Sequence, residues 1–142
     1  MNSLFEATRL VFYHKQATSA RTLFLRFNDT VCAFDTLPSS ARLSETPEIQ
    51  PVTIHPAPLI TQAEQRLGLP HGSLEIEKEF YQQVEALTGL ITIYLMRFTA
   101  LDAPHEIVAP SGGHFISLME ARDLPPVELE LLRRAYAVIM EG

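Results

Sequence analysis

The run LITIYLMRFTA, residues 90–100, limits the possible folds of this chain more than any other segment does. It is apolar almost without a break, rich in β-branched residues, and far too short to span a bilayer. Such a run is typical of a central strand that is covered on both faces. It therefore predicts a mixed α/β domain, in which other elements pack against both sides of a sheet.

Length and charge narrow the class of protein. The chain has 142 residues, of which 46% are hydrophobic and 20% charged, so we expect a single domain over residues 1–142. The formal net charge is −6, and the 11 basic residues are scattered along the sequence. This distribution argues against binding to a nucleic-acid duplex, which needs clustered cations. It leaves room for a small phosphate ligand held by one or two arginines.

The N-terminus and the cysteine content together predict the cellular compartment. The sequence begins MNSLFEATRL, without the basic stretch and apolar segment of a secretory signal, so we expect a cytoplasmic protein with no membrane association. Cys32 is the one cysteine and lies in the apolar run VCAF. A buried, inert thiol is expected there rather than a nucleophile.

The first third of the chain reads mainly as strands. Ser3 and Glu6 have capping-box spacing for a helix, whereas residues 9–13 suit a strand, which is the reading we favour. TLFLRF, Asn28-Asp29 and TVCAF then form two β-rich runs around a turn, which predicts a hairpin over residues 22–34.

A long loop and two helices are predicted next. Residues 35–58 are rich in proline, serine and threonine, so we expect a long Pro-rich loop with at most a short strand at Val52–Ile54. A short helix should follow over Leu59–Leu67, ended by Gly68 and Pro70. The strongest helical pattern comes after it, over residues 73–87. Its N-cap is Ser73, its apolar stripe is Ile76, Phe80, Val84 and Leu87, and Gly89 ends it.

The C-terminal third predicts a strand and a final helix. Gly112-Gly113 precedes HFISL, a strand over residues 114–118, and the glycines suit either a turn or a close approach of backbone to ligand. Pro125 and Pro126 suit the first turn of a helix that continues through two adjacent apolar rows. A stripe of that width predicts core packing, with an interface in a homodimer as the alternative.

The order of these elements resembles the Nudix superfamily. In GLPHGSLEIEKEFYQQVEALTGL, residues 68–90, Gly68 and Gly89 have the separation of the first and last glycines of the Nudix box, and VEALTGL is similar to the end of its helix. HFISLMEARDLPPVELELLRRAYAVI resembles the strand, turn and final helix of the family. The resemblance implies a Nudix-like α/β/α sandwich with a mixed β-sheet.

The same resemblance implies that the catalytic residues are missing. Nudix hydrolases use glutamates three and four positions apart on one helix face to hold divalent metal against a diphosphate. Here the Arg-Glu pair of the box is Gln82-Gln83 and its later glutamates are Ala86 and Leu87. Neutral or apolar side chains cannot replace oxygen ligands for magnesium or manganese.

The leading hypothesis is therefore a non-catalytic binding or regulatory protein for a nucleotide or another phosphorylated small molecule, without a metal or other cofactor. Its ligand-binding candidates are Gln82, Gln83, Arg26, Arg97 and His114. The first alternative is an active Nudix-type nucleoside diphosphate hydrolase that uses Mg or Mn, with Glu75 and Glu79 as displaced acidic residues one helical turn apart. The second alternative is a dimerising adaptor protein without a ligand.

Overall fold

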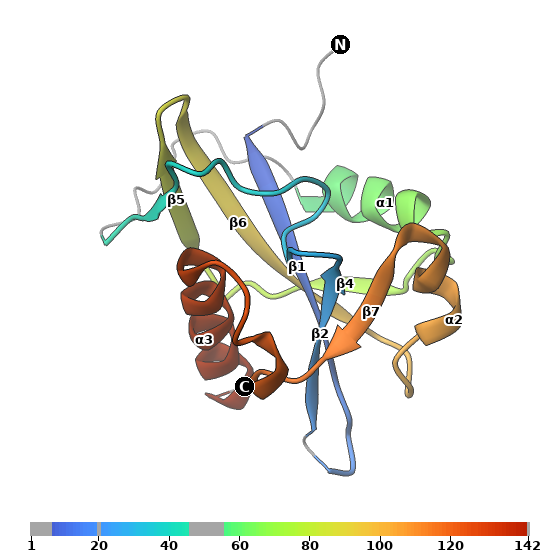
Figure 1. The fold of residues 1–142 in the computed structure, drawn as a ribbon. Coiled ribbons are helices and arrows are strands. Elements are labelled where there is room, and N and C mark those ends of the chain that lie inside the picture. Colours follow the sequence, from blue (N-terminus) through green and yellow to red (C-terminus); the bar gives the residue numbers. More distant parts are fainter. Residues whose placement is uncertain (1–6, 20, 46–55, 142) are drawn as a thin grey trace.

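One mixed seven-stranded sheet organises the part of the chain that the computed structural model describes, residues 7–19, 21–45 and 56–141 (Figure 1). Its strands are β1 (Thr8–Lys15), β2 (Thr22–Phe27), β3 (Arg42–Leu43), β4 (Leu74–Ile76), β5 (Gln82–Ala86), β6 (Gly89–Phe98) and β7 (Gly113–Ile116). The strand order is β3-β5-β6-β1-β2-β7, and β4 also pairs with β6. β1 and β6 run parallel, whereas the other pairs are antiparallel.

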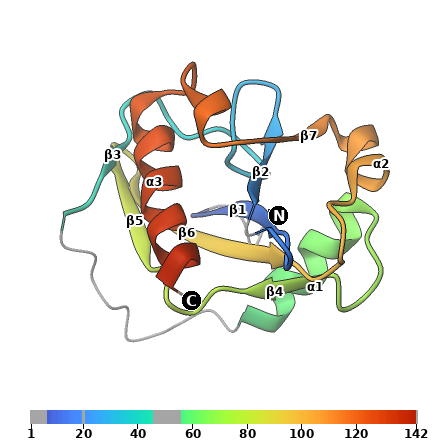
Figure 2. The ribbon, with the colours of Figure 1, turned by 90° about the horizontal axis from the view of Figure 1, so that it is seen from below.

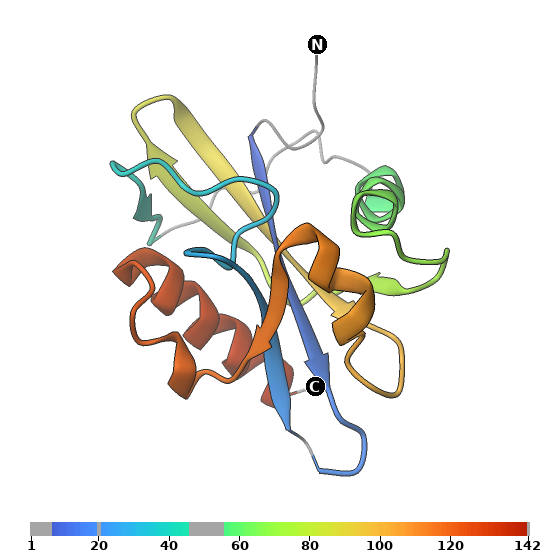
Figure 3. The same ribbon diagram turned by 45° about the vertical axis from the view of Figure 1, so that its right-hand side comes forward.

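Helices cover both faces of this sheet, which gives an α/β/α sandwich. They are α1 (Pro56–Leu67), the short α2 (His105–Val108) and α3 (Pro126–Glu141), with the 3₁₀ turns η1 (Ala109–Ser111) and η2 (Met119–Ala121) between the last two. Figures 2 and 3 show α3 on one side of the central strands and α1 on the other.

The two central strands divide their side chains between the layers. In β1, Val11 and Tyr13 belong to the hydrophobic cluster on the α3 side, whereas Leu10 and Phe12 belong to the cluster on the α1 side. β6 does the same, because Ile91, Ile93 and Leu95 face α3 whereas Met96 and Phe98 face α1. This alternation is the two-residue period of a strand, and it confirms a central strand covered on both faces, which ends at Phe98, two residues earlier than the predicted run.

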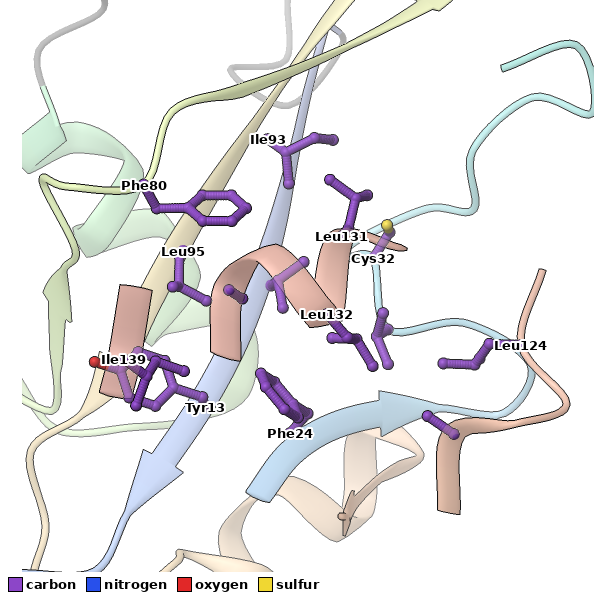
Figure 4. Packing of buried hydrophobic residues seen from close by; sticks show 14 of the residues in the cluster. Tyr13, Phe24, Cys32, Phe80, Ile93, Leu95, Leu124, Leu131, Leu132 and Ile139 are labelled. Carbon is purple, nitrogen blue, oxygen red and sulfur yellow. The ribbon is translucent and has the colours of Figure 1, made fainter. Parts of the chain in front are cut away.

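The α3 layer shows why the final helix needs its wide apolar stripe. Leu131, Leu132 and Ile139 are almost fully buried against side chains of β1, β2 and β6, as Figure 4 shows. Tyr136 and Met140, at the edge of the stripe, are 38% and 40% exposed. Most of the stripe is therefore core, as expected for a helix packed on a sheet.

Several local predictions are confirmed. β1 covers the strand favoured at residues 9–13, α1 covers Leu59–Leu67, and α3 matches the predicted C-terminal helix. β7 matches the predicted strand over residues 114–116 but ends at Ile116, before residues 117–118. Gly68 ends α1 with φ of +73°, a left-handed conformation that a residue without Cβ adopts at little cost.

The predicted hairpin over residues 22–34 is wrong beyond its turn. Phe27 and Thr30 pair across Asn28-Asp29, with backbone hydrogen bonds of 2.7 and 3.0 Å. The ladder stops there, because Ala33 pairs with Leu10 while β2 is occupied on its two edges by β1 and β7. Pairing between distant segments therefore replaces the local hairpin.

The predicted helix over residues 73–87 is also wrong, since this segment contains β4 and β5. β5 pairs with β6 through a tight turn at Leu87-Thr88, and Leu87, assigned to the apolar stripe, is 93% exposed. The long loop over residues 35–58 is wrong at two places, because β3 lies within it and α1 begins at Pro56. The expected strand at Val52–Ile54 and the capping pair Ser3 and Glu6 lie outside the described residues.

Within the described residues, no helix has both the length and the apolar character needed to cross a membrane.

Candidate functional site

A cavity of about 440 Å³ lies between the segment that follows β2 and the C-terminal end of α1. Its volume falls within the usual range for small-molecule sites, roughly 300–1,000 Å³. The lining side chains are aromatic, polar and charged, and they come from three separate parts of the chain. They are Phe27, Asn28, Asp29, Thr30, Cys32, Phe34, Asp35, Thr36, Arg66 and Ser111. We call residues 27–36 the wall segment, because they form most of the lining.

Arg66 brings a cation to this cavity. It lies in the last turn of α1, and its guanidinium carbon is 4.3 Å from the centroid of the Phe34 ring. A guanidinium over an aromatic face is attracted by the negative face of the ring. Phe34 itself packs on Phe12 and Phe27, at centroid distances of 6.1 and 6.4 Å. The stacking therefore ties the cation to the apolar layer under α1.

Arg26 fixes the turn at the start of the wall segment. Its guanidinium donates two hydrogen bonds to the Asp123 carboxylate, at 2.8 and 2.7 Å, and its Nε donates to the Asn28 carbonyl at 2.6 Å. Asn28 has φ of +53°, which asparagine tolerates better than most residues. The hydrogen bond from Arg26 lowers the pKa of Asp123 to about 2. Arg26 is thus used to hold the wall and does not line the cavity.

Glu128 holds the next part of the wall from the opposite layer. One carboxylate oxygen accepts a hydrogen bond from the Val31 amide at 2.8 Å, and the other accepts from the Thr30 hydroxyl at 2.9 Å. The side chain is buried, and burial raises the pKa of Glu128 although these hydrogen bonds act in the opposite direction.

Arg9 supports the far end of the wall segment. Its Nε and one terminal nitrogen lie 3.3 and 3.2 Å from the Thr36 carbonyl, to which both donate. Asp29 and Asp35, which also line the cavity, are exposed carboxylates. Across the residues that the structure describes, no three His, Cys, Asp or Glu side chains come together as a set able to hold a metal ion. The charged group that most distinguishes the cavity is therefore Arg66.

The glutamines proposed as ligand-binding residues lie in β5, away from this cavity. The Gln82 side chain accepts a hydrogen bond of 2.7 Å from Arg134 of α3, and Gln83 is fully buried in the sheet. The residues predicted for catalysis are also elsewhere. Glu75 lies in β4 and pairs with Arg97 at 2.6 Å, and Glu79 is exposed beyond the end of that strand. The helical turn expected between Glu75 and Glu79 does not exist.

His114 lies in β7 opposite Arg26 and is exposed, outside the cavity lining. The preceding glycines have distinct roles. Gly112 adopts φ of +82° at the end of η1, whereas a Cβ at Gly113 would meet Leu25 at 2.9 Å. Both observations agree with a turn and close packing.

The sequence did not predict Phe34 and Arg66 as site residues. The only available signal was the position of Arg66 immediately before the helix end at Leu67-Gly68.

Comparison with family models gives no match for this sequence, and comparison with curated proteins gives none either. Comparison with solved structures does give matches. The crystal structure of an Ap4A hydrolase from C. elegans, a Nudix enzyme, resembles this chain with a TM-score of 0.53 and 16% sequence identity, over 92% of this chain and 94% of that chain. At this identity the similarity shows the fold. The chain has a Nudix-like α/β/α fold with a mixed sheet.

Proposed function

We propose that this protein is a non-catalytic Nudix-like binding module that holds a nucleotide or another phosphorylated small molecule in the cavity beside Arg66. The observation that carries the proposal is the position of Arg66, at the end of α1 and on the cavity wall. A planar guanidinium suits bidentate recognition of phosphate oxygens.

As part of this proposal, we assign the degenerate Nudix box to a segment upstream of residues 68–90, and the helix α1 supports that assignment. The family's box helix ends in Thr-Gly-Leu, and α1 ends in the similar sequence Leu67-Gly68-Leu69. With this placement the Arg-Glu pair of the box becomes Thr61-Gln62, and the two later glutamates become Gln65-Arg66. The first glycine of the box becomes Pro47, which lies outside the described residues.

This placement explains why we expect binding without metal. Three positions at which the family carries metal-binding glutamates are occupied by Gln62, Gln65 and Arg66, and none of these offers a carboxylate. Arg66 also brings a positive charge to the position of a metal ligand. A cation fixed in the chain can neutralise phosphate directly, so it replaces part of the role that a divalent metal has in an active enzyme.

The rest of the cavity supplies complementary chemistry for such a ligand. Phe27 and Phe34 offer apolar surface for a planar base, while Asn28, Thr36 and Ser111 carry hydrogen-bonding groups. The exposed carboxylates of Asp29 and Asp35 are suited to accept hydrogen bonds from sugar hydroxyls or amino groups. A ligand with a base, a sugar and phosphate therefore matches the lining better than a purely apolar one.

The test is thermal unfolding of the purified protein with nucleotides, dinucleotides and sugar nucleotides, each with and without Mg or Mn. We expect at least one compound to raise the midpoint without metal, because a ligand that binds only the folded state stabilises it by mass action. Arg66→Ala should abolish that shift. Arg133→Ala is the matched control, since Arg133 is exposed on α3 in the opposite layer.

The other outcomes separate the alternatives. A shift that requires metal, together with release of phosphate or pyrophosphate products, would favour the hydrolase. No shift with any compound, together with a mass in solution that rises with concentration, would favour the dimerising adaptor.

A further inference from the structure

Glu128 connects the C-terminal helix α3 to the wall segment through hydrogen bonds from Thr30 and Val31. We infer that Glu128 is a positioning residue that keeps the wall segment packed in place with Cys32 buried and, if the proposed function holds, keeps the cavity ready for its ligand. The inference about closure rests on the hydrogen bonds of Glu128 alone. Only its consequence for affinity depends on the proposed function.

The contacts of Glu128 form a short chain into the cavity lining. Its carboxylate accepts hydrogen bonds from the Val31 amide and the Thr30 hydroxyl, and the Thr30 hydroxyl oxygen in turn accepts a 3.0 Å hydrogen bond from the Cys32 amide. Thr30 and Cys32 both line the cavity. A single side chain from α3 therefore holds three consecutive residues of the wall segment in place, two directly and Cys32 through Thr30.

Among the described residues, strand pairing does not hold Val31 and Cys32 in place. β2 ends at Phe27, Thr30 forms an isolated bridge with it, and the next backbone pairing is a second isolated bridge, in which Ala33 exchanges hydrogen bonds of 2.8 Å with Leu10. Between these two points, the Val31 amide is satisfied by Glu128 and the Cys32 amide by Thr30. Removal of the carboxylate would leave buried donors without their acceptor, which a folded chain relieves by local opening.

The environment of Glu128 also suits a positioning role. The residue is 2% exposed, and the charged or titratable groups that act on it or near it are Arg26 and the Cys32 thiol. A carboxylate at such a depth is costly unless its hydrogen bonds compensate. A glutamine has the same shape, can accept from the Val31 amide and can donate to the Thr30 oxygen. Glu128→Gln is therefore the conservative variant, whereas Glu128→Ala removes both contacts.

Cys32 provides a direct readout of wall opening. It is the one cysteine of the chain, it is 1% exposed, and burial raises the pKa of its thiol, so a thiol reagent labels it when the wall or the whole fold opens. The experiment measures the labelling rate of the full-length protein by a thiol-specific reagent at constant pH. We expect Glu128→Ala to raise the rate by about tenfold or more, because two hydrogen bonds to a charged group are lost. Glu128→Gln should label at nearly the wild-type rate.

Global unfolding also exposes Cys32, so a control of equal stability is needed. Ile139 lies near the other end of α3, in the hydrophobic cluster that also contains Val31 and Cys32, and its side chain makes no hydrogen bonds to the wall because it is apolar. Ile139→Val or Ile139→Ala, whichever matches the unfolding midpoint of Glu128→Ala, should label more slowly than Glu128→Ala. If the alanine variant does not fold, Glu128→Asp takes its place, because its shorter carboxylate retains the charge but not the reach.

The outcomes separate this inference from the proposed function. Equal labelling of Glu128→Ala and its stability-matched control would overturn the positioning role. Faster labelling of Glu128→Ala than of its stability-matched control supports the positioning role, whether or not a ligand is present. ADP, used as the probe, should slow labelling of the wild type and do so less in Glu128→Ala. Faster labelling of Glu128→Ala without any ADP effect on the wild type would support the positioning role and count against the cavity as a nucleotide site.

Discussion

Replacing Gly113 with alanine should destabilise the fold through a steric clash. A Cβ built at this position lies 2.9 Å from Cδ1 of Leu25, 3.2 Å from the Val108 carbonyl oxygen and 3.4 Å from the Phe27 ring. Leu25 is fully buried, and the Val108 oxygen is backbone, so neither atom can move aside freely. Overpacking of this kind costs about 1–3 kcal/mol.

The cost is measurable as a fall in the thermal midpoint. For a chain of 142 residues we take about 3–5 °C for each kcal/mol, between the values for smaller and larger domains, so the midpoint should fall by roughly 3–15 °C. Calorimetry or circular dichroism against temperature measures it. Gly68→Ala is the control, because φ is +73° there and nothing lies within 4 Å of the added Cβ. That variant should lose about 1–2 kcal/mol, because a residue with a Cβ is strained in the left-handed conformation.

A wild-type midpoint for Gly113→Ala would refute the packing argument. A loss of ligand binding at an unchanged midpoint would instead support the reading in which these glycines let backbone approach a ligand.

The remaining predictions concern charged groups. Asp123 has its pKa lowered to about 2 from an ordinary 3.8, so its pair with Arg26 stabilises the fold above pH 3.8 and loses this effect as the pH falls towards 2. Melting curves across that range should show wild type and Asp123→Asn converging in acid, and a constant difference would contradict the assignment. Glu128 has a raised pKa, so the wild type should lose stability relative to Glu128→Gln as the pH rises through that pKa. Denaturant titrations at several pH values measure this difference in stability, and the reverse trend would contradict the raised pKa. The double variant Glu75→Gln, Glu79→Gln should change the free energy of unfolding by less than about 1 kcal/mol, because the Glu75 and Arg97 side chains are 53% and 40% exposed. It should also leave any effect of metal on the thermal midpoint unchanged. A lost metal response would favour the hydrolase with displaced acidic residues.

The elements whose pattern reflects their own burial could be predicted from sequence. Residues 90–100 are apolar on both faces because β6 is central, and the wide stripe of α3 covers one face of the sheet. The helix predicted over residues 73–87 was wrong because Ile76, Phe80 and Val84 have helical spacing although they lie in and around two strands. β5 forms a hairpin with β6, and β4 pairs with the C-terminal end of β6, Leu74 opposite Phe98, so pairing with the central strand overrides the helical spacing.

The cavity could not be predicted for the same reason. Phe34 and Arg66 are distant in sequence, and only the layering of α1 on the sheet brings the guanidinium onto the ring. Arg26 looked available for phosphate as an isolated basic residue, but Asp123, far along the chain, accepts both of its terminal hydrogen bonds. Long-range ion pairing of this kind leaves no local mark in the sequence.

The central claim is that a phosphorylated ligand binds beside Arg66 without metal. A crystal structure of the protein with the most stabilising compound of the thermal panel, prepared with a chelator, tests this most directly. We expect density in the cavity, with phosphate oxygens within hydrogen-bond distance of Arg66 and the base against Phe27 or Phe34. Ligand bound away from the wall segment, or binding that requires a metal held by carboxylates, would contradict it.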